Sequence, residues 1–420
     1  MVTLPEEFIR ITRELMGEER FARYLAAFNE EPPVSIRINP LKVKGGRGMA
    51  KGEYHSPLTT HQVPWCEYGL YLSHRPNFTF DPLLHAGCYY VQEAASMFTH
   101  HILHSSLIPY PSPLNLLDLC AAPGGKSTCA ISALPEGTKL WANEPMRQRA
   151  SILLENITKW GYPNCIVTNN YPRDYARSGL TFDIILCDVP CSGEGMFRRD
   201  PQTISEWSPQ NVEKCWRLQR EIVSDAWNSL RPGGLLIYST CTFNTKENEE
   251  NVRWILENFD ADILPIVTKP EWNITGSLLK GFDAPVYRFI PGITKSEGLF
   301  VAVLKKNHLL PLSESEGGTM APTRKNHGND GLKVISPSSF WKGDEGEALT
   351  YSQAIAYLRG EAIMLPDDAP RGIVTVSFMG HPLGQAKNIG NRANNLYPKE
   401  WRIKSTHVPQ EYEPVVANNF

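Results

Sequence analysis

Apolar residues follow two alternating patterns between residue 114 and about residue 306. Short, nearly continuous apolar segments are separated by longer stretches in which apolar residues recur at helical spacing. The first pattern predicts buried strands and the second predicts amphipathic helices. The predicted strands are 114–119, 139–143, 165–169, 182–189, 234–240 and 299–306. This alternation predicts an α/β domain with a doubly wound, mostly parallel, Rossmann-like sheet, which binds ligands beyond the carboxyl ends of its strands.

The regions on either side of this core have other patterns. Residues 1–31 carry apolar residues at helical spacing and are followed by Pro32-Pro33, which predicts short packed helices. Residues 307–332 are rich in Ser, Gly and polar residues and predict a linker. Short strands, aromatics and turns after the linker predict a small α+β module. We therefore expect an N-terminal extension (1–110), a core (111–306), a linker (307–332) and a C-terminal module (333–420).

Composition narrows the class of protein. The chain has 420 residues, of which 41% are hydrophobic and 21% charged, as in an ordinary globular protein. No apolar run approaches the roughly 20 residues of a membrane helix. The nine cysteines show no regular spacing, which argues against a secreted disulfide scaffold. We expect a cytoplasmic protein that does not bind membranes.

The net charge of −3 means that any nucleic-acid site must be a local basic patch. Residues 34–52 carry five basic residues, among them Arg37, and no acidic one. They are a candidate phosphate-contacting segment, with a solvated loop as the alternative. Residues 371–404 carry six basic residues and one acid, interleaved with aromatic residues (Phe378, Tyr397 and Trp401). Charge combined with stacking aromatics favours an RNA surface, with a solvated face as the alternative.

A glycine-rich turn follows the first predicted strand of the core. The sequence LDLCAAPGGKST (117–128) ends like a phosphate-binding loop, but Cys120 stands where that motif requires glycine. Such a turn can instead let a nucleoside approach the backbone closely. Glu144 ends the second strand, where a carboxylate can accept the ribose hydroxyls. The pair predicts S-adenosyl-L-methionine as the cofactor rather than a nucleoside triphosphate.

Two cysteines stand just past the ends of two later strands. Cys191 follows Asp188 by three residues in DVPCSG, and Cys241 lies in STCT. An isolated cysteine is usually a small core residue, and we interpret the other cysteines in that way, with Cys120 and Cys187 as strand walls. A metal site is a poor alternative, because no Cys-x-x-Cys or nearby His pair completes a ligand set.

Methyl transfer to carbon 5 of cytosine is a reaction that requires thiols. Carbon 5 has no lone pair, and a thiolate that adds to carbon 6 makes carbon 5 nucleophilic. A carboxyl group must stabilise the N3 edge of the ring, and the carbon-5 proton must leave before the thiol is expelled. Asp188, two cysteines and a nucleoside-binding turn fit this chemistry.

These motifs resemble the RNA (cytosine-5) methyltransferases of the RsmB/NOP (Sun) family. The matching segments are LDLCAAPGGKST, ANE, DVPCSGEGMFRRDP and YSTCT, and HAGCYYVQEAASM (85–97) resembles the segment that leads into the family's catalytic domain. The resemblance implies that Cys241 is the nucleophile and that Cys191 assists product release. It also implies that Asp188 binds the cytosine edge and supplies the N3 proton. DNA enzymes attack with the Pro-Cys thiol instead, so the presence of both cysteines points to RNA and away from DNA.

The resemblance also assigns the cofactor side of the site. Lys126 is expected to hydrogen-bond in the pocket or to position Asp188. Many relatives carry an Asp after the third strand that contacts adenine. Here the segment reads VTNNYPRD, and we assign that contact to Asn170. The implied cofactor-binding residues are Cys120, Ala121, Ala122, Pro123, Gly124, Gly125, Lys126, Glu144, Asn170 and Asp188.

The C-terminal sequence SFMGHPLGQAKNIGNRANNLYPKEWRIK (377–404) resembles the PUA-like RNA-binding module that ends RsmF-type enzymes. This resemblance implies a cytosine of small-subunit 16S ribosomal RNA as the target, with RNA contacts also expected from the N-terminal extension. Methylation of a tRNA cytosine by the same chemistry is an alternative. A non-catalytic RNA-binding factor of ribosome assembly is another, although a pure binder would need no thiols. We expect a monomer.

Overall fold

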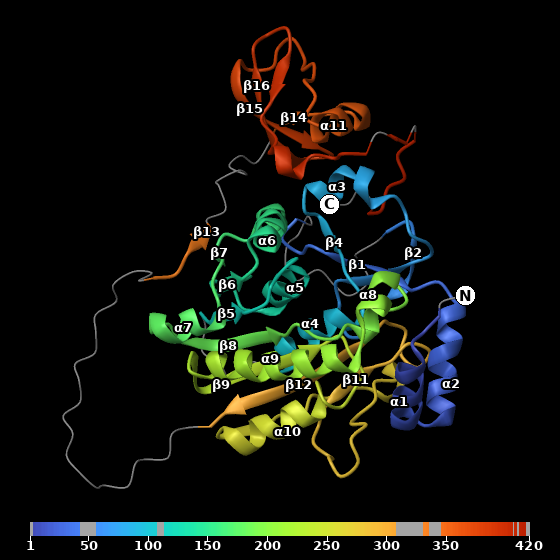
Figure 1. Cartoon of the computed structure of the whole chain (residues 1–420). Helices are drawn as coiled ribbons and strands as arrows, with labels where there is room; N and C mark the ends of the chain where they lie inside the picture. Colours follow the sequence, from blue (N-terminus) through green and yellow to red (C-terminus); the bar gives the residue numbers. More distant parts are fainter. Residues whose placement is uncertain are drawn as a thin grey trace, which may run out of the picture.

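The computed structural model describes residues 3–42, 56–106, 113–307, 331–335, 346–405, 407–409 and 411–416. Within these residues a nine-stranded sheet forms the centre of the molecule (Figure 1). Its five parallel strands lie in the order β7 (Cys165–Thr168), β6 (Lys139–Asn143), β5 (Asn115–Asp118), β8 (Phe182–Asp188) and β9 (Leu230–Thr240). The strand order reverses between β5 and β8, which is where a doubly wound sheet opens its ligand crevice. The predicted Rossmann-like fold is confirmed.

Antiparallel strands complete both edges of this sheet. On one side β12 (Leu299–Lys306) pairs with β9, and β10 (Ala261–Ile263) and β11 (Tyr287–Phe289) pair with β12. On the other side β13 (Val334–Ile335) pairs with β7. The C-terminal module was expected to begin at residue 333, but residues 334–335 belong to the core sheet. The other expected boundaries, after residues 110 and 306, stay predictions, and most of the predicted linker lies outside the described residues.

Successive side chains of the strands face opposite sides of the sheet, and each side has its own helices. Leu116, Leu140 and Ile184 share one core with α4 (Phe98–Ser106), α5 (Gly125–Ala133) and α6 (Arg147–Trp160). Leu117, Trp141 and Ile185 share the other with α7 (Pro172–Ser178), α9 (Pro209–Trp227) and α10 (Glu249–Asn258). Across the described ranges, no helix combines the length and apolar character that a membrane span requires.

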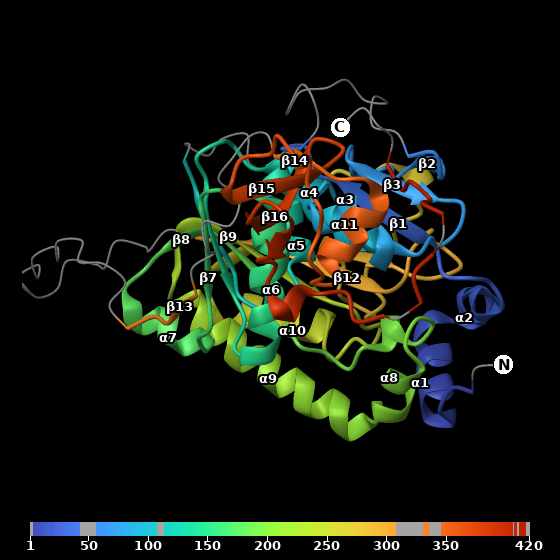
Figure 2. The ribbon, with the colours of Figure 1, turned by 90° about the horizontal axis from the view of Figure 1, so that it is seen from above.

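The N-terminal extension has a helical part and a sheet part. Helices α1 (Glu6–Met16) and α2 (Glu18–Ala26) lie beside α8 (Pro201–Glu206) in both ribbon views (Figures 1 and 2). Phe8 packs edge-on against Phe197 and Trp207, so the predicted N-terminal helices do pack on the core. The sheet is antiparallel, with the order β2 (Thr59–Gln62), β3 (Gly69–Leu72), β1 (Val34–Ile38), β4 (Tyr89–Val91).

One expectation for this region is wrong. Arg37 was expected in a phosphate-contacting segment, but in β1 its side chain is completely buried. It points its donors at the core, as described below, and cannot reach a phosphate. Residues 43–55, which hold most of the other basic positions of that segment, lie outside the described residues.

The C-terminal module is the small α+β unit that the sequence predicts. Its sheet has the order β14 (Glu347–Ala348), β15 (Gly372–Phe378), β16 (His381–Asn388), β17 (Ala393–Asn395), and α11 (Tyr351–Leu358) packs on it. The module sits above the N-terminal α3 (Pro82–His85) in Figure 1. Tyr351 donates to the carbonyl of Phe80 at 3.1 Å, and Tyr412 donates to Asp81 at 3.2 Å.

The proposed stacking aromatics of this module need correction. Phe378 and Tyr397 are buried in its core and cannot stack on bases. Trp401 is half-buried. The basic residues behave as expected, because Arg371, Lys387, Arg392, Lys399 and Lys404 are exposed and Arg402 is half-buried. Alternating aromatic and basic residues here reflect a packed core under a charged surface.

Candidate active site

The glycine-rich turn joins β5 to α5. Gly124 has φ +112°, a backbone conformation that favours glycine. The turn is held to the next strand by the N–H of Ala121, which donates to the carbonyl of Asn143 at 2.8 Å. Asp118, at the end of β5, accepts from Ser127 on one oxygen at 2.6 Å, and its other oxygen has no hydrogen bond within the described residues. Burial raises the pKa of Asp118 to about 7.

Glu144 lies at the end of β6, where the ribose of an adenosine would bind. Its carboxylate is 2% exposed, and one oxygen accepts from the N–H of Met146 at 3.0 Å. The other oxygen lies 3.4 Å from the guanidinium of Arg149 but has no hydrogen-bond partner in the described part of the chain. Arg149 instead donates to the carbonyl of Ala122 at 2.8 Å. One oxygen of Glu144 therefore stays available to a ligand hydroxyl.

The residues after β7 are occupied by a segment from far along the chain. The amide of Asn170 donates to the carbonyl of Lys333 at 3.2 Å, and its oxygen accepts from the N–H of Lys333 at 2.9 Å. Asn169 donates to the carbonyls of Glu144 and Pro145, both at 2.8 Å. Because both ends of the Asn170 amide serve residue 333, this arrangement does not favour the adenine contact assigned to it. That assignment stays a prediction.

The turn and the catalytic strands meet at one ion pair. Lys126 Nζ lies 2.8 Å from Asp188 Oδ2, and Ser239 donates to Asp188 Oδ1 at 2.7 Å. Burial alone would lower the pKa of Lys126, but the Asp188 carboxylate and its hydrogen bond outweigh burial, so the pKa is raised. Of the two roles expected for Lys126, the geometry favours the positioning of Asp188.

The two thiols meet as well. Cys191 Sγ lies 3.2 Å from Cys241 Sγ, and the N–H of Cys241 donates to Cys191 Sγ at 3.4 Å. Both residues are half-buried. The hydrogen bond between the two sulfurs, together with burial, raises the pKa of Cys191 well above its ordinary value. Either sulfur can donate in this contact, so Cys191 can pass a proton to the sulfur of Cys241.

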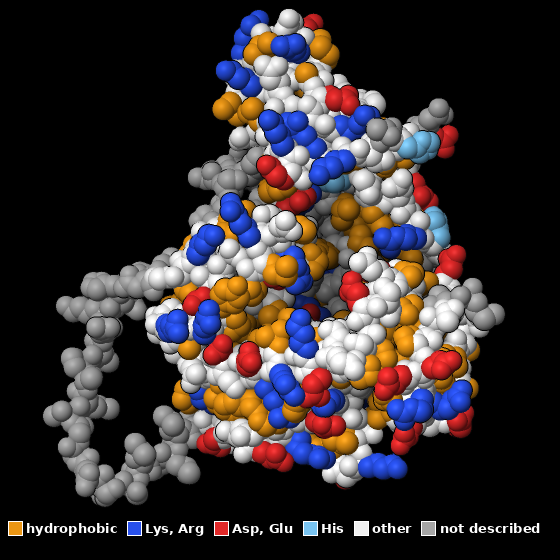
Figure 3. Space-filling view, viewed as in Figure 1, with side chains coloured by type: hydrophobic (Ala, Val, Ile, Leu, Met, Phe, Trp, Pro, Cys, Tyr) orange, Lys and Arg blue, Asp and Glu red, His pale blue; other side chains and the backbone are white. Residues whose placement is uncertain are grey.

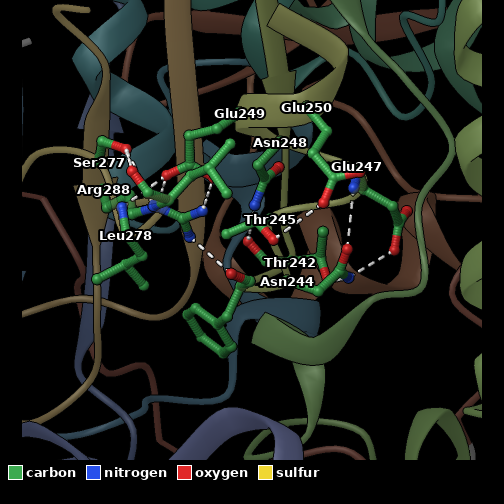
Figure 4. A network of polar contacts seen from close by, with 12 residues as sticks. Thr242, Asn244, Thr245, Glu247, Asn248, Glu249, Glu250, Ser277, Leu278 and Arg288 are labelled. Carbon is green, nitrogen blue, oxygen red and sulfur yellow. Dashed lines mark hydrogen bonds and ion pairs between the residues drawn. The ribbon is translucent and has the colours of Figure 1, made fainter. Parts of the chain in front are cut away.

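Sequence reasoning missed the polar residues behind the thiols. Figure 4 shows Asn244 and Glu247 in one network with Thr242 and Asn248. Glu247 is buried and accepts from the side chain of Asn244 at 2.8 Å and from the N–H of Ser192 at 3.0 Å. The backbones of the two thiol loops also lie very close together, because a Cβ on Gly195 would lie 2.9 Å from the carbonyl oxygen of Cys241. A run of acidic and amide residues directly after the STCT motif was the signal that could have indicated this network.

Sequence reasoning also missed the support behind the glycine-rich turn. Arg37 donates to Gln92 at 2.7 Å, to the Thr128 hydroxyl at 2.6 Å and to the Thr128 carbonyl at 3.2 Å. Gln92 donates to the carbonyl of Gly125 at 3.1 Å. The N-terminal sheet thus grips the first turn of α5. No local pattern reveals this contact, since Arg37 and Thr128 are 91 positions apart.

Three family models match the chain. Residues 4–94 match the N-terminal domain of 16S rRNA methyltransferase RsmF, residues 107–305 match 16S rRNA methyltransferase RsmB/F, and residues 348–403 match the methyltransferase RsmF PUA domain. Ribosomal RNA small subunit methyltransferase F of Escherichia coli is 30% identical, over 95% of this chain and 96% of its own length. The protein of the same name from Cronobacter sakazakii is 29% identical with the same coverage.

Solved structures share the fold. A methyltransferase homolog protein from Pyrococcus horikoshii is 27% identical, with a TM-score of 0.59 over 73% of this chain and 96% of that chain. NSun6 from Pyrococcus horikoshii, solved with SFG, is 22% identical, with a TM-score of 0.59 over 73% of this chain and 99% of that chain.

The residues present fit the cofactor of this family, S-adenosyl-L-methionine. Gly124 allows the positive φ of the turn, and its missing side chain lets the turn pack closely on α6, where a Cβ would lie 3.3 Å from Leu153. The unpartnered buried oxygen of Glu144 is suited to a ribose hydroxyl. The relatives match 95% of the chain, and the family models match residues 4–94, 107–305 and 348–403. This chain belongs to the RsmB/F family and is an S-adenosyl-L-methionine-dependent methyltransferase of its RsmF branch.

Proposed function

We propose that this protein methylates carbon 5 of a cytosine in RNA, in the cytoplasm, through a covalent bond to Cys241. The observation that carries the proposal is the contact between two sulfurs at 3.2 Å, on loops that begin where Asp188 pairs with Ser239 at the ends of β8 and β9. Transfer to nitrogen or oxygen would use an existing lone pair and would need neither thiol. A carbon nucleophile needs all three groups.

The chemistry starts with the addition of the Cys241 thiolate to carbon 6, which forms a sulfur–carbon bond and moves the ring electrons toward carbon 5. Asp188 holds the N3 edge and the proton that N3 carries in this adduct. The cofactor, when bound, supplies an electrophilic methyl group, which carbon 5 accepts. Cys191 then passes its proton to the departing sulfur of Cys241, and the resulting Cys191 thiolate takes the carbon-5 proton. The electron pair of that carbon–hydrogen bond re-forms the ring double bond as the bond between carbon 6 and the Cys241 sulfur breaks, and the N3 proton returns to Asp188. The target base must leave its helix to reach these groups.

The remaining polar groups have supporting roles in this scheme. Cys191 contacts the sulfur that must leave at 3.2 Å, which places it to assist elimination. Lys126 holds one oxygen of the Asp188 carboxylate, and Ser239 holds the other. The orientation of the carboxylate is thus set before a base arrives, which is how positioned groups lower a barrier.

We favour 16S ribosomal RNA as the substrate, because relatives that match 95% of this chain are named ribosomal RNA small subunit methyltransferase F and two matching family models are described as 16S rRNA methyltransferases. The same chemistry on tRNA is the second candidate. Bisulfite sequencing of both RNA classes, with and without this protein, tests the choice. We expect one protected cytosine in 16S rRNA to be lost with the protein. If a protected cytosine is lost in tRNA alone, tRNA is the substrate. If no protected cytosine is lost in either RNA, the proposed methylation of cytosine is overturned.

We propose that the exposed basic face of the C-terminal module supplies RNA affinity. Figure 3 shows Lys and Arg side chains on this module, above a hollow that separates it from the core. Charge reversal at Lys387, Arg392 and Lys404 should weaken RNA binding and reduce its salt dependence by roughly one counterion per lost phosphate contact. Lys269→Glu, on an exposed loop of the core, is the control. An unchanged salt slope in the triple variant would contradict this role.

A further inference from the structure

Two buried carboxylates behind the thiols have no cationic partner within ion-pair distance in the described ranges. Glu194 is 3% exposed and Glu247 is fully buried. Their neighbour Glu249 shows the usual arrangement, because it is buried against the guanidinium of Arg288 (Figure 4). A buried charge without a counterion costs folding free energy. Hydrogen bonds to Glu194 and Glu247 therefore have to offset this cost.

The contacts are reciprocal between the two thiol-bearing loops. Glu194 stands three residues after Cys191, and it accepts from the N–H groups of Phe243 and Asn244 at 2.7 and 3.0 Å, just after Cys241. Glu247 stands six residues after Cys241, and it accepts from the N–H of Ser192 at 3.0 Å, just after Cys191. Each loop thus carries a carboxylate that grips the backbone of the other.

The side-chain amide of Asn244 links the two carboxylates. The side-chain nitrogen of Asn244 donates to Glu194 at 3.1 Å and to Glu247 at 2.8 Å. The hydroxyls of Ser192 and Thr242 lie 2.8 Å apart, and the N–H of Gly195 donates to the carbonyl of Cys241 at 2.8 Å. Hydrogen bonds to a charged acceptor are roughly twice as strong as neutral ones.

A pocket borders part of the far side of these loops. A cavity of about 570 Å³ lies there, and its walls include Glu194, Trp207, Asn244 and Lys246 together with residues of α1. The backbone after Cys241 therefore borders empty space on one side. On the other side Phe243 packs against Tyr24 and its carbonyl accepts from Arg288 at 2.8 Å, so the carboxylate contacts hold this backbone together with a packed core.

We propose that Glu194 and Glu247 are positioning residues that clasp the two thiol loops and hold the sulfurs in register for attack and elimination. This inference rests on the proposed covalent mechanism. Neither carboxylate contacts a sulfur, and each acts through backbone that flanks a cysteine. Misplacement of reacting atoms by about 1 Å can cost roughly 100-fold in rate, so loss of the clasp should appear in the covalent step.

The test uses the full-length protein, S-adenosyl-L-methionine and a small-subunit rRNA transcript made with 5-fluorocytidine. Fluorine on carbon 5 cannot leave as a proton does, so the methylated adduct persists on a denaturing gel and its rate of formation is measured. We expect Glu194→Ala and Glu247→Ala to form the adduct roughly 10- to 100-fold more slowly than wild type. Glu194→Gln and Glu247→Gln should recover part of the rate, since an amide oxygen still accepts a backbone N–H.

The control is Asp183→Asn. Asp183 is a buried carboxylate that also accepts a backbone N–H, from Asn115, but it lies at the opposite end of the strands. This variant should lower the melting temperature and leave the adduct rate unchanged. Calorimetry should show unchanged cofactor affinity for the Glu194 and Glu247 variants.

The outcomes separate the two proposals. Absence of an adduct with wild-type protein would overturn the covalent mechanism and the clasp with it. A wild-type adduct with equal rates in all Glu194 and Glu247 variants would overturn the clasp alone. Equal slowing by Asp183→Asn would also overturn it, because the effect would then follow general destabilisation.

Discussion

The two halves of the active site are held in different ways. The thiol half, after β8 and β9, is held by its own two loops, through Glu194, Asn244 and Glu247. The cofactor half, after β5, β6 and β7, is held from outside the core. Arg37 of the N-terminal sheet grips the start of α5, and Lys333 occupies the residues after β7.

Different contacts therefore control the position of the thiols and the shape of the cofactor-binding turn. Contacts within two adjacent loops hold the backbone beside both thiols, and the N-terminal extension adds ring contacts to these loops, Tyr24 on Phe243 and Phe8 on Phe197. The glycine-rich turn, in contrast, depends on residues about 90 positions upstream and the Asn170 segment on residues about 160 downstream. Changes in the outer parts should therefore alter cofactor binding first, and changes in the loops should alter the covalent step.

The largest effects are expected within the thiol half. Cys241→Ala removes the nucleophile, so it should form neither a covalent RNA adduct nor product. Cys191→Ala should still attack and methylate, then stall before elimination and accumulate the adduct on a denaturing gel. The reverse result, with adduct only in Cys241→Ala, would swap the roles of the two thiols. Unchanged methylation in both variants would show that the mechanism is not covalent.

The next largest effect is expected where the two halves meet. Lys126→Met leaves Asp188 without its ammonium partner, so the carboxylate should lose its orientation toward the cytosine edge. We expect methyl transfer in a single turnover to fall by roughly 100-fold, the usual scale for a misaligned acid–base group. Lys269→Met, at an exposed lysine of the core, is the control. An unaltered rate in Lys126→Met would mean that Ser239 alone positions Asp188.

The sequence could predict the site residues that lie at strand ends, but not the supports that come from distant segments. Residues 120–126, Glu144, Asp188, Cys191 and Cys241 follow strand ends, and apolar patterns locate strand ends well. Arg37 looked like a surface residue because its neighbours are basic, and its acceptors lie 88 to 95 positions away on α5. The prediction that Phe378 and Tyr397 stack on bases was wrong for a similar reason, because both are buried in the core of the module. An aromatic residue beside a basic one fits a core or a stacking surface equally, and only the fold decides.

A smaller effect should distinguish direct from indirect support of the cofactor. Glu144→Ala removes a proposed ribose acceptor and should weaken cofactor binding by about 1.5–3 kcal/mol, the worth of a hydrogen bond to a charged group. Arg37→Met cannot touch the cofactor, but it releases the carbonyls and hydroxyl at the start of α5. We expect it to weaken binding by about 1 kcal/mol, measured by calorimetry.

The control for Arg37→Met is Arg75→Met, at an exposed arginine of the same extension. It should bind the cofactor as wild type does. The comparison between the two halves would fail if Arg37→Met left cofactor affinity unchanged, or if Glu194→Ala weakened it as much as Glu144→Ala does.

The smallest effect concerns the free energy of unfolding, which the buried Glu247 carboxylate lowers when it is charged. Burial, and then the Glu194 carboxylate, raise the pKa of Glu247 from 4.5 to about 7. The other titratable groups that face Glu247 are Cys191, Cys215 and Tyr238, and its charge raises the pKa of each. Between pH 4.5 and 7 the folded state holds a proton on Glu247 that the unfolded state releases. The stabilising contribution of Glu247 is therefore present below pH 4.5 and is lost as the pH rises through 7.

Glu247→Gln has no charge to bury at any pH. It should match wild type near pH 5 and exceed it near pH 8, by roughly 1–3 kcal/mol in the free energy of unfolding. His85 and His100 change stability in the opposite direction, because burial lowers the pKa of each to about 3. Both proteins share that contribution, so the difference between their urea unfolding curves isolates Glu247. A variant that is more stable at pH 8 yet slower to form the adduct would show that the charge serves the thiol loops at the expense of the fold. Parallel pH curves for the two proteins would mean that Glu247 ionises no differently in the folded and unfolded chain.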